Sequence, residues 1–203
     1  RMEMLGGISH DLRTPLTRMK LQLALISDKE AVKNLTKDVS EMEMMVNEYL
    51  DYLRGIGREE KKETKLSKIL KEIVGSYTKS KHDIALRIEN DAKVMLRPMA
   101  FKRCITNIIN NSIKYGTRII ISADVADDKI TIMIDDNGPG IPESKYDEVF
   151  RPFVKLDTAR NQDKSGAGLG LSIVRDIVSS DGGEVTLDES PLGGLRVVIT
   201  LPM

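Results

Sequence analysis

Residues 9–16 read Ser9-His10-Asp11-Leu12-Arg13-Thr14-Pro15-Leu16 and place one of the chain's two histidines beside a carboxylate. They lie in a run whose apolar residues recur at steps of three and four, the period of a helix with one buried stripe. The stripe consists of Met2, Leu5, Ile8, Leu12, Leu16, Met19, Leu23 and Ile26. At about 100° per residue, His10 points away from this stripe. Such a pair is more often a solvated surface pair than a reactive site, and only the other motifs decide between the two.

The composition excludes several classes of protein. The 203 residues include 31 basic and 31 acidic side chains, and the zero net charge argues against binding to nucleic acid or to an anionic membrane through bulk charge. A single cysteine, Cys104, excludes an internal disulfide. No apolar run is long enough to span a bilayer, and no signal-peptide pattern is present. Because Arg1 already lies inside the helical stripe, we expect the chain to be a fragment of a longer protein.

The first 57 residues predict a helical hairpin. The first helix runs to about Ile26, and Pro15 bends it. Ser27 and Glu30 then have the spacing of a capping box at the start of a second helix. The apolar positions of that helix alternate strictly in steps of three and four, as in a heptad seam: Val32, Leu35, Val39, Met42, Val46, Tyr49 and Leu53. Because a lone hairpin buries too little, we expect residues 1–54 to form a homodimeric four-helix bundle.

The glycines at 55 and 57 and the charged segment 58–65 predict a polar linker before a second domain at 66–203. Helical and strand patterns interleave there, which predicts an α+β two-layer sandwich with its helices on one face. We expect helices at 66–77, 98–115, 143–150 and 169–180, and strands at 84–88, 93–96, 118–125, 129–134, 184–187 and 195–201. A hairpin turn is expected at Ala126-Asp127-Asp128, and a mobile polar segment at 154–167.

The predicted helix 98–115 has a polar face. Asn107, Asn111 and Lys114 fall at i, i+4 and i+7, although asparagine is a poor helix former. Amide oxygens can bind Mg²⁺, and a nearby lysine can hold phosphate oxygens. A solvated polar face is the simpler alternative for these residues taken alone.

Two glycine motifs follow. In Asp136-x-Gly138-x-Gly140, directly after a strand, the carboxylate could accept a hydrogen bond from an exocyclic amine such as that of adenine. An ordinary Asx-Gly turn is the alternative. Gly166-x-Gly168-x-Gly170 precedes a helix, where free amides and the helix dipole favour an anion. Its spacing is neither the dinucleotide-binding fingerprint nor a P-loop.

The order of these motifs resembles the sensor histidine kinases of bacterial two-component systems, along essentially the whole chain. His10 matches the phosphoacceptor of the H box, and Asn107 with Asn111 matches the N box. Residues 136–140 match the G1 box, Phe150-Arg151-Pro152-Phe153 the F box, and residues 166–170 the G2 box. The H-box sequence and the hairpin end at 49–54 look most like the EnvZ-like osmosensor subgroup.

This resemblance implies a HisKA hairpin followed by a Bergerat-type (GHKL) HATPase_c domain that binds ATP and Mg²⁺. Asp136 would hold the adenine amine, Asn111 would be the Mg²⁺ ligand supported by Asn107, and residues 154–168 would form the ATP lid. Asn110 makes the ligand assignment ambiguous, and we favour Asn111 because it lies in line with Asn107. The remaining nucleotide-binding residues would be Lys114, Tyr115, Gly138, Gly140, Phe153, Gly166, Gly168, Leu169 and Gly170.

By the same resemblance, Asp11 would act as general base for His10, and Thr14 would position water to dephosphorylate a response regulator. We therefore expect an autophosphorylating kinase that passes phosphate from His10 to an aspartate of an OmpR-like response regulator and also acts as its phosphatase. We expect it to be the cytoplasmic domain of an inner-membrane sensor, with no nucleic-acid partner and no membrane contact of its own. A different GHKL ATPase and a non-catalytic dimerisation module are the alternatives.

Overall fold

A computed structural model of the chain describes residues 15–23, 25, 26, 28, 30–33, 35, 36, 39, 40, 42, 43, 46, 59–78, 80–156 and 168–203. The predicted site residues His10, Asp11, Thr14 and Gly166 lie outside the described residues, as does most of the segment 154–167. The chain divides into two compact units, one of 1–58 with 157–169 and one of 59–156 with 170–203.

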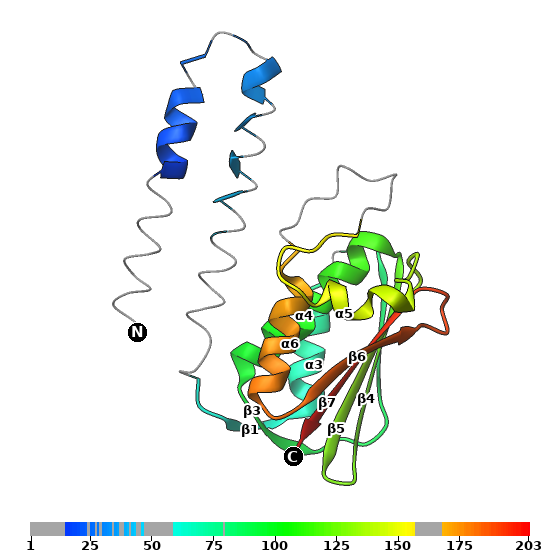
Figure 1. The fold of residues 1–203 in the computed structure, drawn as a ribbon. Coiled ribbons are helices and arrows are strands. Elements are labelled where there is room, and N and C mark those ends of the chain that lie inside the picture. Colours follow the sequence, from blue (N-terminus) through cyan, green and yellow to red (C-terminus); the bar gives the residue numbers. More distant parts are fainter. Residues whose placement is uncertain are drawn as a thin grey trace. The chain divides into compact units, whose positions relative to one another are not determined.

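The second unit is built on a five-stranded sheet with the strand order β2-β4-β5-β7-β6 (Figure 1). All neighbours are antiparallel except β2 and β4, which are parallel. The bounds are β2 Asp83–Ile88, β4 Arg118–Ala126, β5 Lys129–Asp136, β6 Glu184–Glu189 and β7 Leu195–Pro202. Asp127 and Asp128 both have positive φ, at 50° and 57°, which confirms the predicted tight hairpin turn between β4 and β5.

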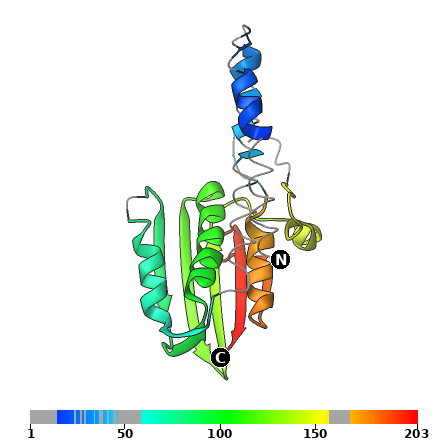
Figure 2. The same cartoon turned by 90° about the vertical axis from the view of Figure 1, so that its left-hand side faces the viewer.

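Three helices cover one face of this sheet, as Figure 2 shows with the helices in front of the strands. They are α3 (Leu66–Gly75), α4 (Pro98–Tyr115) and α6 (Gly170–Ser180). Isoleucines from α4 and from the sheet are almost fully buried between the two layers: Ile105, Ile108, Ile109, Ile119, Ile121, Ile130, Ile132, Ile134 and Ile199. The two-layer sandwich predicted from the sequence is confirmed. A short 3₁₀ turn η1 (Glu143–Lys145) and helix α5 (Tyr146–Val149) precede the segment that leads to α6.

The segment expected as a polar linker contains a strand that the sequence did not predict. β1 (Lys62–Lys65) pairs antiparallel with β3 (Lys93–Leu96), with Lys62 opposite Leu96 and Lys65 opposite Lys93. β1 is largely exposed, so the apolar alternation that marks a half-buried strand is missing from it. Whether 58–65 links two domains stays a prediction, but 62–65 are part of the second unit.

In the first unit, residues 15–23 are helical, as are all the described residues from 30 to 46. Leu16, Leu23 and Val39 are buried together, with Met19 and Val46 packed against them. Asp28 caps the second helix, because its Oδ1 accepts from the backbone N–H of residues 30 and 31 at 3.0 and 3.1 Å. The expected capping box gave this role to Ser27, which lies outside the described residues. Among the described residues, no helix has the length and apolar character needed to cross a membrane.

Candidate functional site

The centre of the site is Asp136, at the end of β5 and only 5% exposed. Its Oδ1 accepts hydrogen bonds from the backbone N–H of Gly138 at 2.9 Å and of Leu195 at 3.1 Å. Its Oδ2 accepts a hydrogen bond from the hydroxyl of Ser112 on α4 at 3.0 Å. A carboxylate offers about four acceptor sites. Asp136 is therefore a buried acceptor held in one orientation, with room for one further donor.

Glycines let the backbone close on this carboxylate. A Cβ on Gly194 would lie 2.4 Å from Asp136 Oδ1 and 2.5 Å from Gly138 N, distances that real Cβ atoms do not show. Gly138 also lies close to the carboxylate, and a Cβ on it would lie 3.0 Å from Asp136 Oδ1 and 3.3 Å from Tyr115 Cβ. Gly140 has a φ of +68°, a conformation that side chains disfavour. The motif Asp136-x-Gly138-x-Gly140 thus contains the Asx turn that the sequence offered as an alternative, and it also encloses a fixed carboxylate.

The sequence did not identify Gly194 or Leu195 as part of this site. Leu195 begins the last predicted strand, and both residues are more than fifty residues from Asp136 along the chain. The pairing of β5 with β7 brings them together, with Asp135 opposite Arg196. The glycine pair 193–194 was a visible signal, but nothing in the sequence gave the register of the strands.

Asn107 and Asn111 both lie on α4, and Asn111 lies near the start of α6. A Cβ on Gly170 would lie 3.3 Å from Asn111 Nδ2 and 3.6 Å from its Oδ1, so the Asn111 amide reaches the first residue of α6. Asn107 Nδ2 is the one buried side-chain nitrogen or oxygen that lacks a hydrogen-bond partner within the described part of the chain. A buried donor without a partner is uncommon and fits a site that a ligand completes.

Asn110 lies in a different environment from Asn111. It is exposed, and its Oδ1 accepts a hydrogen bond from the hydroxyl of Tyr77 at 2.8 Å. The ambiguity between the neighbouring asparagines is thereby reduced, since Asn111 and not Asn110 lies against Gly170.

The last turn of α4 adds positive charge. Burial, and secondarily the charge of Lys155, lower the pKa of Lys114 below its usual value. The Lys114 ammonium also lies 5.3 Å from the centroid of the Tyr115 ring. A bound anion would relieve the repulsion between two lysines. Among the residues that the structure describes, no group of three or more His, Cys, Asp or Glu could hold a metal ion.

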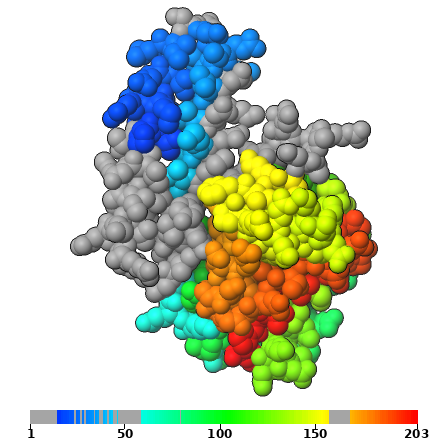
Figure 3. Space-filling view, in the orientation of Figure 1, coloured from blue at the N-terminus to red at the C-terminus, as the bar shows by residue number. Residues whose placement is uncertain are grey.

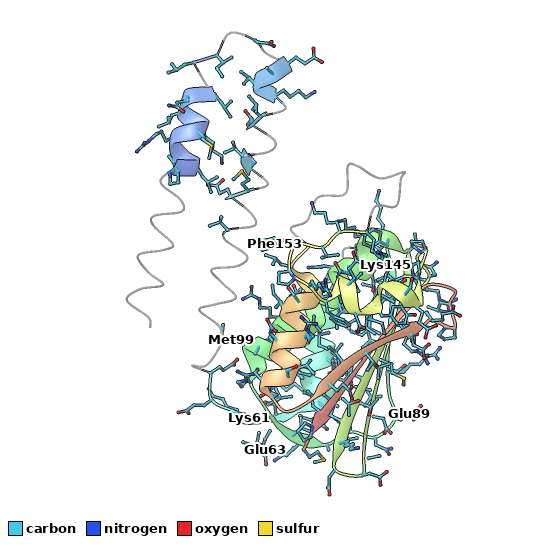
Figure 4. The ribbon with its side chains drawn as sticks, viewed as in Figure 1. Lys61, Glu63, Glu89, Met99, Lys145 and Phe153 are labelled. Atoms are coloured by element: carbon cyan, nitrogen blue, oxygen red, sulfur yellow. The ribbon has the colours of Figure 1, made fainter. Side chains whose placement is uncertain are left out.

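The segment after α5 lies beside α6 on the surface (Figure 3). Phe150 is buried, and the Arg175 guanidinium of α6 lies 5.6 Å from the centroid of its ring. Phe153, labelled in Figure 4, is 58% exposed and has a φ of 66°, which is a rare conformation for a bulky side chain. The two aromatic residues of the predicted F box therefore differ, one being part of the core and one lying at the surface.

The second glycine motif is only partly described. Gly168 has a φ of +71°, Leu169 is buried, and Gly170 begins α6. Gly166 lies outside the described residues, so its place in the site stays a prediction.

Comparisons with known proteins agree with this architecture. Residues 96–203 match the family of histidine kinase-, DNA gyrase B- and HSP90-like ATPases, and residues 1–56 match the His Kinase A (phospho-acceptor) domain. The whole chain is 35% identical over 205 residues to the sensor histidine kinase GtrS of Pseudomonas aeruginosa and covers 42% of it. It is 31% identical over 220 residues to the sensor histidine kinase CpxA of Escherichia coli and covers 47% of it.

The chain therefore spans less than half the length of these curated relatives. Among solved structures, full-length ShkA in complex with AMPPNP aligns with 98% of this chain and 45% of its own, at a TM-score of 0.76 and 20% identity. That likeness concerns the fold.

Proposed function

Because the chain belongs to the sensor histidine kinases, we propose that it binds ATP in its second unit and transfers the γ-phosphoryl group to His10. The group then passes to an aspartate of a response regulator, for which we propose the OmpR-like class. The observation that carries the proposal is the fixed carboxylate of Asp136, which keeps one acceptor site free beside a helix that bears an unpartnered buried donor.

The chemistry of the described residues supports an adenine nucleotide as the ligand. The free acceptor of Asp136 suits an exocyclic amine, and Tyr115 packs on Gly138 next to it. Asn107 Nδ2 would donate to a phosphate oxygen, and the charges of Lys114 and Lys155 favour the polyphosphate. Gly140, Phe153, Gly166, Gly168, Leu169 and Gly170 complete the proposed nucleotide-binding set.

The asparagine side-chain oxygens on α4 also suit Mg²⁺. A hard cation that keeps several waters needs few protein ligands, and neutral amide oxygens with phosphate oxygens suffice. We propose Asn111 as the protein ligand, supported by Asn107. The ion would neutralise phosphate charge, while the residues of the chain position the nucleotide.

The chemistry at His10 rests on the match of residues 1–56 to the phospho-acceptor domain. A neutral imidazole nitrogen attacks the γ-phosphorus, a nitrogen–phosphorus bond forms, and the bond to the β-phosphate oxygen breaks to release ADP. Asp11 would hold the proton on the other ring nitrogen, so that the attacking nitrogen carries a free lone pair. Thr14 would position the water that dephosphorylates the response regulator.

We also propose a homodimer through residues 1–54. In the described part of the hairpin, Leu21, Leu25, Leu35 and Met42 are exposed, and the last two belong to the predicted heptad seam. A second hairpin would cover this surface and form a four-helix bundle. The curated relatives are longer sensor proteins, which supports the proposal that this chain is the cytoplasmic catalytic part of a membrane sensor.

The test is to incubate the chain with Mg²⁺ and γ-labelled ATP. We expect an acid-labile, alkali-stable label that His10→Ala abolishes while ATP binding persists. His82→Ala is the matched control, because His82 is the only other histidine and its Nδ1 is engaged by Ser80 Oγ at 2.7 Å. A label that survives in His10→Ala, or unchanged ATP turnover there, would favour a different ATPase of the same fold.

Phosphatase activity needs its own experiment. We expect Thr14→Ala to keep autophosphorylation and to lose the ability to dephosphorylate a phosphorylated OmpR-like response regulator. Equal loss of both activities would assign Thr14 to the integrity of the hairpin instead.

A further inference from the structure

Ser112 occupies an unusual position for its residue type. It follows Asn111 on α4, is only 3% exposed, and donates its hydroxyl hydrogen to Asp136 Oδ2 at 3.0 Å. Serine inside a helix usually bonds back to a carbonyl one turn earlier. Here the hydroxyl reaches from the helix layer to the end of strand β5, which makes it the side-chain link between α4 and the carboxylate.

The hydrogen bonds of Asp136 show what this link does. Oδ1 is filled by two backbone donors, Gly138 and Leu195. Oδ2 has the Ser112 hydroxyl, so only one of its acceptor sites remains. The backbone donors fix one oxygen, and Ser112 fixes the other, so the plane of the carboxylate is set.

We propose that Ser112 is a positioning residue that sets the preference of the site for a base with an amino group. This proposal rests on the proposed function, in which Asp136 binds the base. With Ser112 in place, the free site of Oδ2 accepts a donor and repels a carbonyl oxygen. Without the hydroxyl, a water molecule can take its place and turn either a donor or an acceptor toward the base.

The effect of losing the Ser112 hydroxyl should be confined to binding of the base, although Ser112 directly follows Asn111. Ser112 contacts Asp136, whereas the phosphate end of the proposed site relies on Asn107, Asn111 and Lys114. Loss of the hydroxyl should therefore change recognition of the amino group more than recognition of the triphosphate.

The experiment compares ATP with purine riboside triphosphate, which lacks the amino group, by calorimetric titration of the full chain with Mg²⁺. The wild type should bind ATP more tightly. Ser112→Ala should lower ATP affinity about tenfold, as expected for one hydrogen bond to a charged group, and change the affinity for the analogue by less than twofold.

Ser112→Thr, which keeps the hydroxyl, should restore the ratio of ATP affinity to analogue affinity. Ser172→Ala removes a similarly buried serine on α6 and is the matched control for a lost hydroxyl.

Each possible result either supports or overturns the proposed role of Ser112. An unchanged ratio in Ser112→Ala overturns the proposal, whether both affinities fall together or neither changes, while the role of Asp136 stands. A wild type that does not distinguish the two nucleotides overturns the role of Asp136 in the proposed function as well. Should Ser112→Ala fail to fold, Ser112→Cys, with a weak donor of similar size, must show the same reduced ratio.

Discussion

Arg196 on β7 lies opposite Asp135 on β5 and binds both of its carboxylate oxygens, with Nε at 2.8 Å from Oδ1 and Nη2 at 3.1 Å from Oδ2. The hydrogen bond to Asp135 is the main cause that raises the pKa of Arg196 above its usual value. Because successive side chains of a strand face opposite sides, Asp135 and Asp136 point to opposite faces of the sheet. The two adjacent buried carboxylates therefore differ in their partners. Asp135 binds the guanidinium of Arg196 on the neighbouring strand, and Asp136 faces the helices.

We expect Arg196→Leu to lower the free energy of unfolding by about 2 to 3 kcal/mol, because it leaves Asp135 buried without its partner. The double variant Asp135→Asn/Arg196→Leu should recover part of this loss. Urea unfolding followed by circular dichroism measures the free energy of unfolding of the single and the double variant. Arg87→Leu, on the exposed side of β2, is the control, and equal midpoints for the two arginine variants would contradict the expectation.

Gly194→Ala should abolish nucleotide binding. The added Cβ would lie 2.4 Å from Asp136 Oδ1, so either the carboxylate or the turn before β7 must move. Gly75→Ala, where nothing lies within 4 Å, should leave binding unchanged. Titration with ATP distinguishes the two, and a Gly194→Ala variant with wild-type affinity would show that the carboxylate is not held as described.

Glu59→Ala should reduce stability by about 1 kcal/mol, the usual effect of removing a helix N-cap. The Glu59 carboxylate accepts from the backbone N–H of Met99 at 2.7 Å and of Ala100 at 2.9 Å, in the first turn of α4. Figure 4 shows Lys61 and Met99 toward the same end of the unit. Hydrogen exchange at these two amides should accelerate in Glu59→Ala and not in the control Glu60→Ala, which alters the exposed neighbour. Equal exchange in both variants would mean that Glu59 does not cap α4.

Cys104 should resist alkylation in the folded protein. Burial raises the pKa of its thiol to about 12, so almost no thiolate forms up to pH 9. Iodoacetamide labelling followed by mass spectrometry should show modification only after denaturant is added. The unfolded thiol ionises near its ordinary pKa of 9.0 while the folded one stays protonated, so this group's contribution to stability falls as pH rises between about 9 and 12. Rapid labelling of the native protein at pH 8 would contradict this.

The sequence predicted the elements whose side chains carry a strong period. The helix 98–115 was found with the bounds of α4, because Pro98 and Gly116 mark its ends and buried isoleucines mark its face. β4 and β5 and the turn between them also agree with the expectation. These features are local, and local physics suffices to recognise them.

Long-range contacts were not predictable in the same way. The partners of Asp136 come from α4 and from the start of β7, and only the strand register makes Leu195 a donor to it. The exposed strand β1 has no apolar pattern to reveal it. The roles of His10, Asp11, Thr14 and Gly166 stay predictions, because these residues lie outside the described part of the chain.

The hydrogen bond from Leu195 to Asp136 has a consequence for a chain that lacks β7. β7 lies between β5 and β6 in the sheet, yet it follows both of them along the chain. Until it is in place, Oδ1 of Asp136 lacks one of its two backbone donors and the Gly194 turn does not close on the carboxylate. A chain without β7 would therefore carry Asp136, Gly138 and Gly140 and still lack the backbone contacts that fix the Asp136 carboxylate.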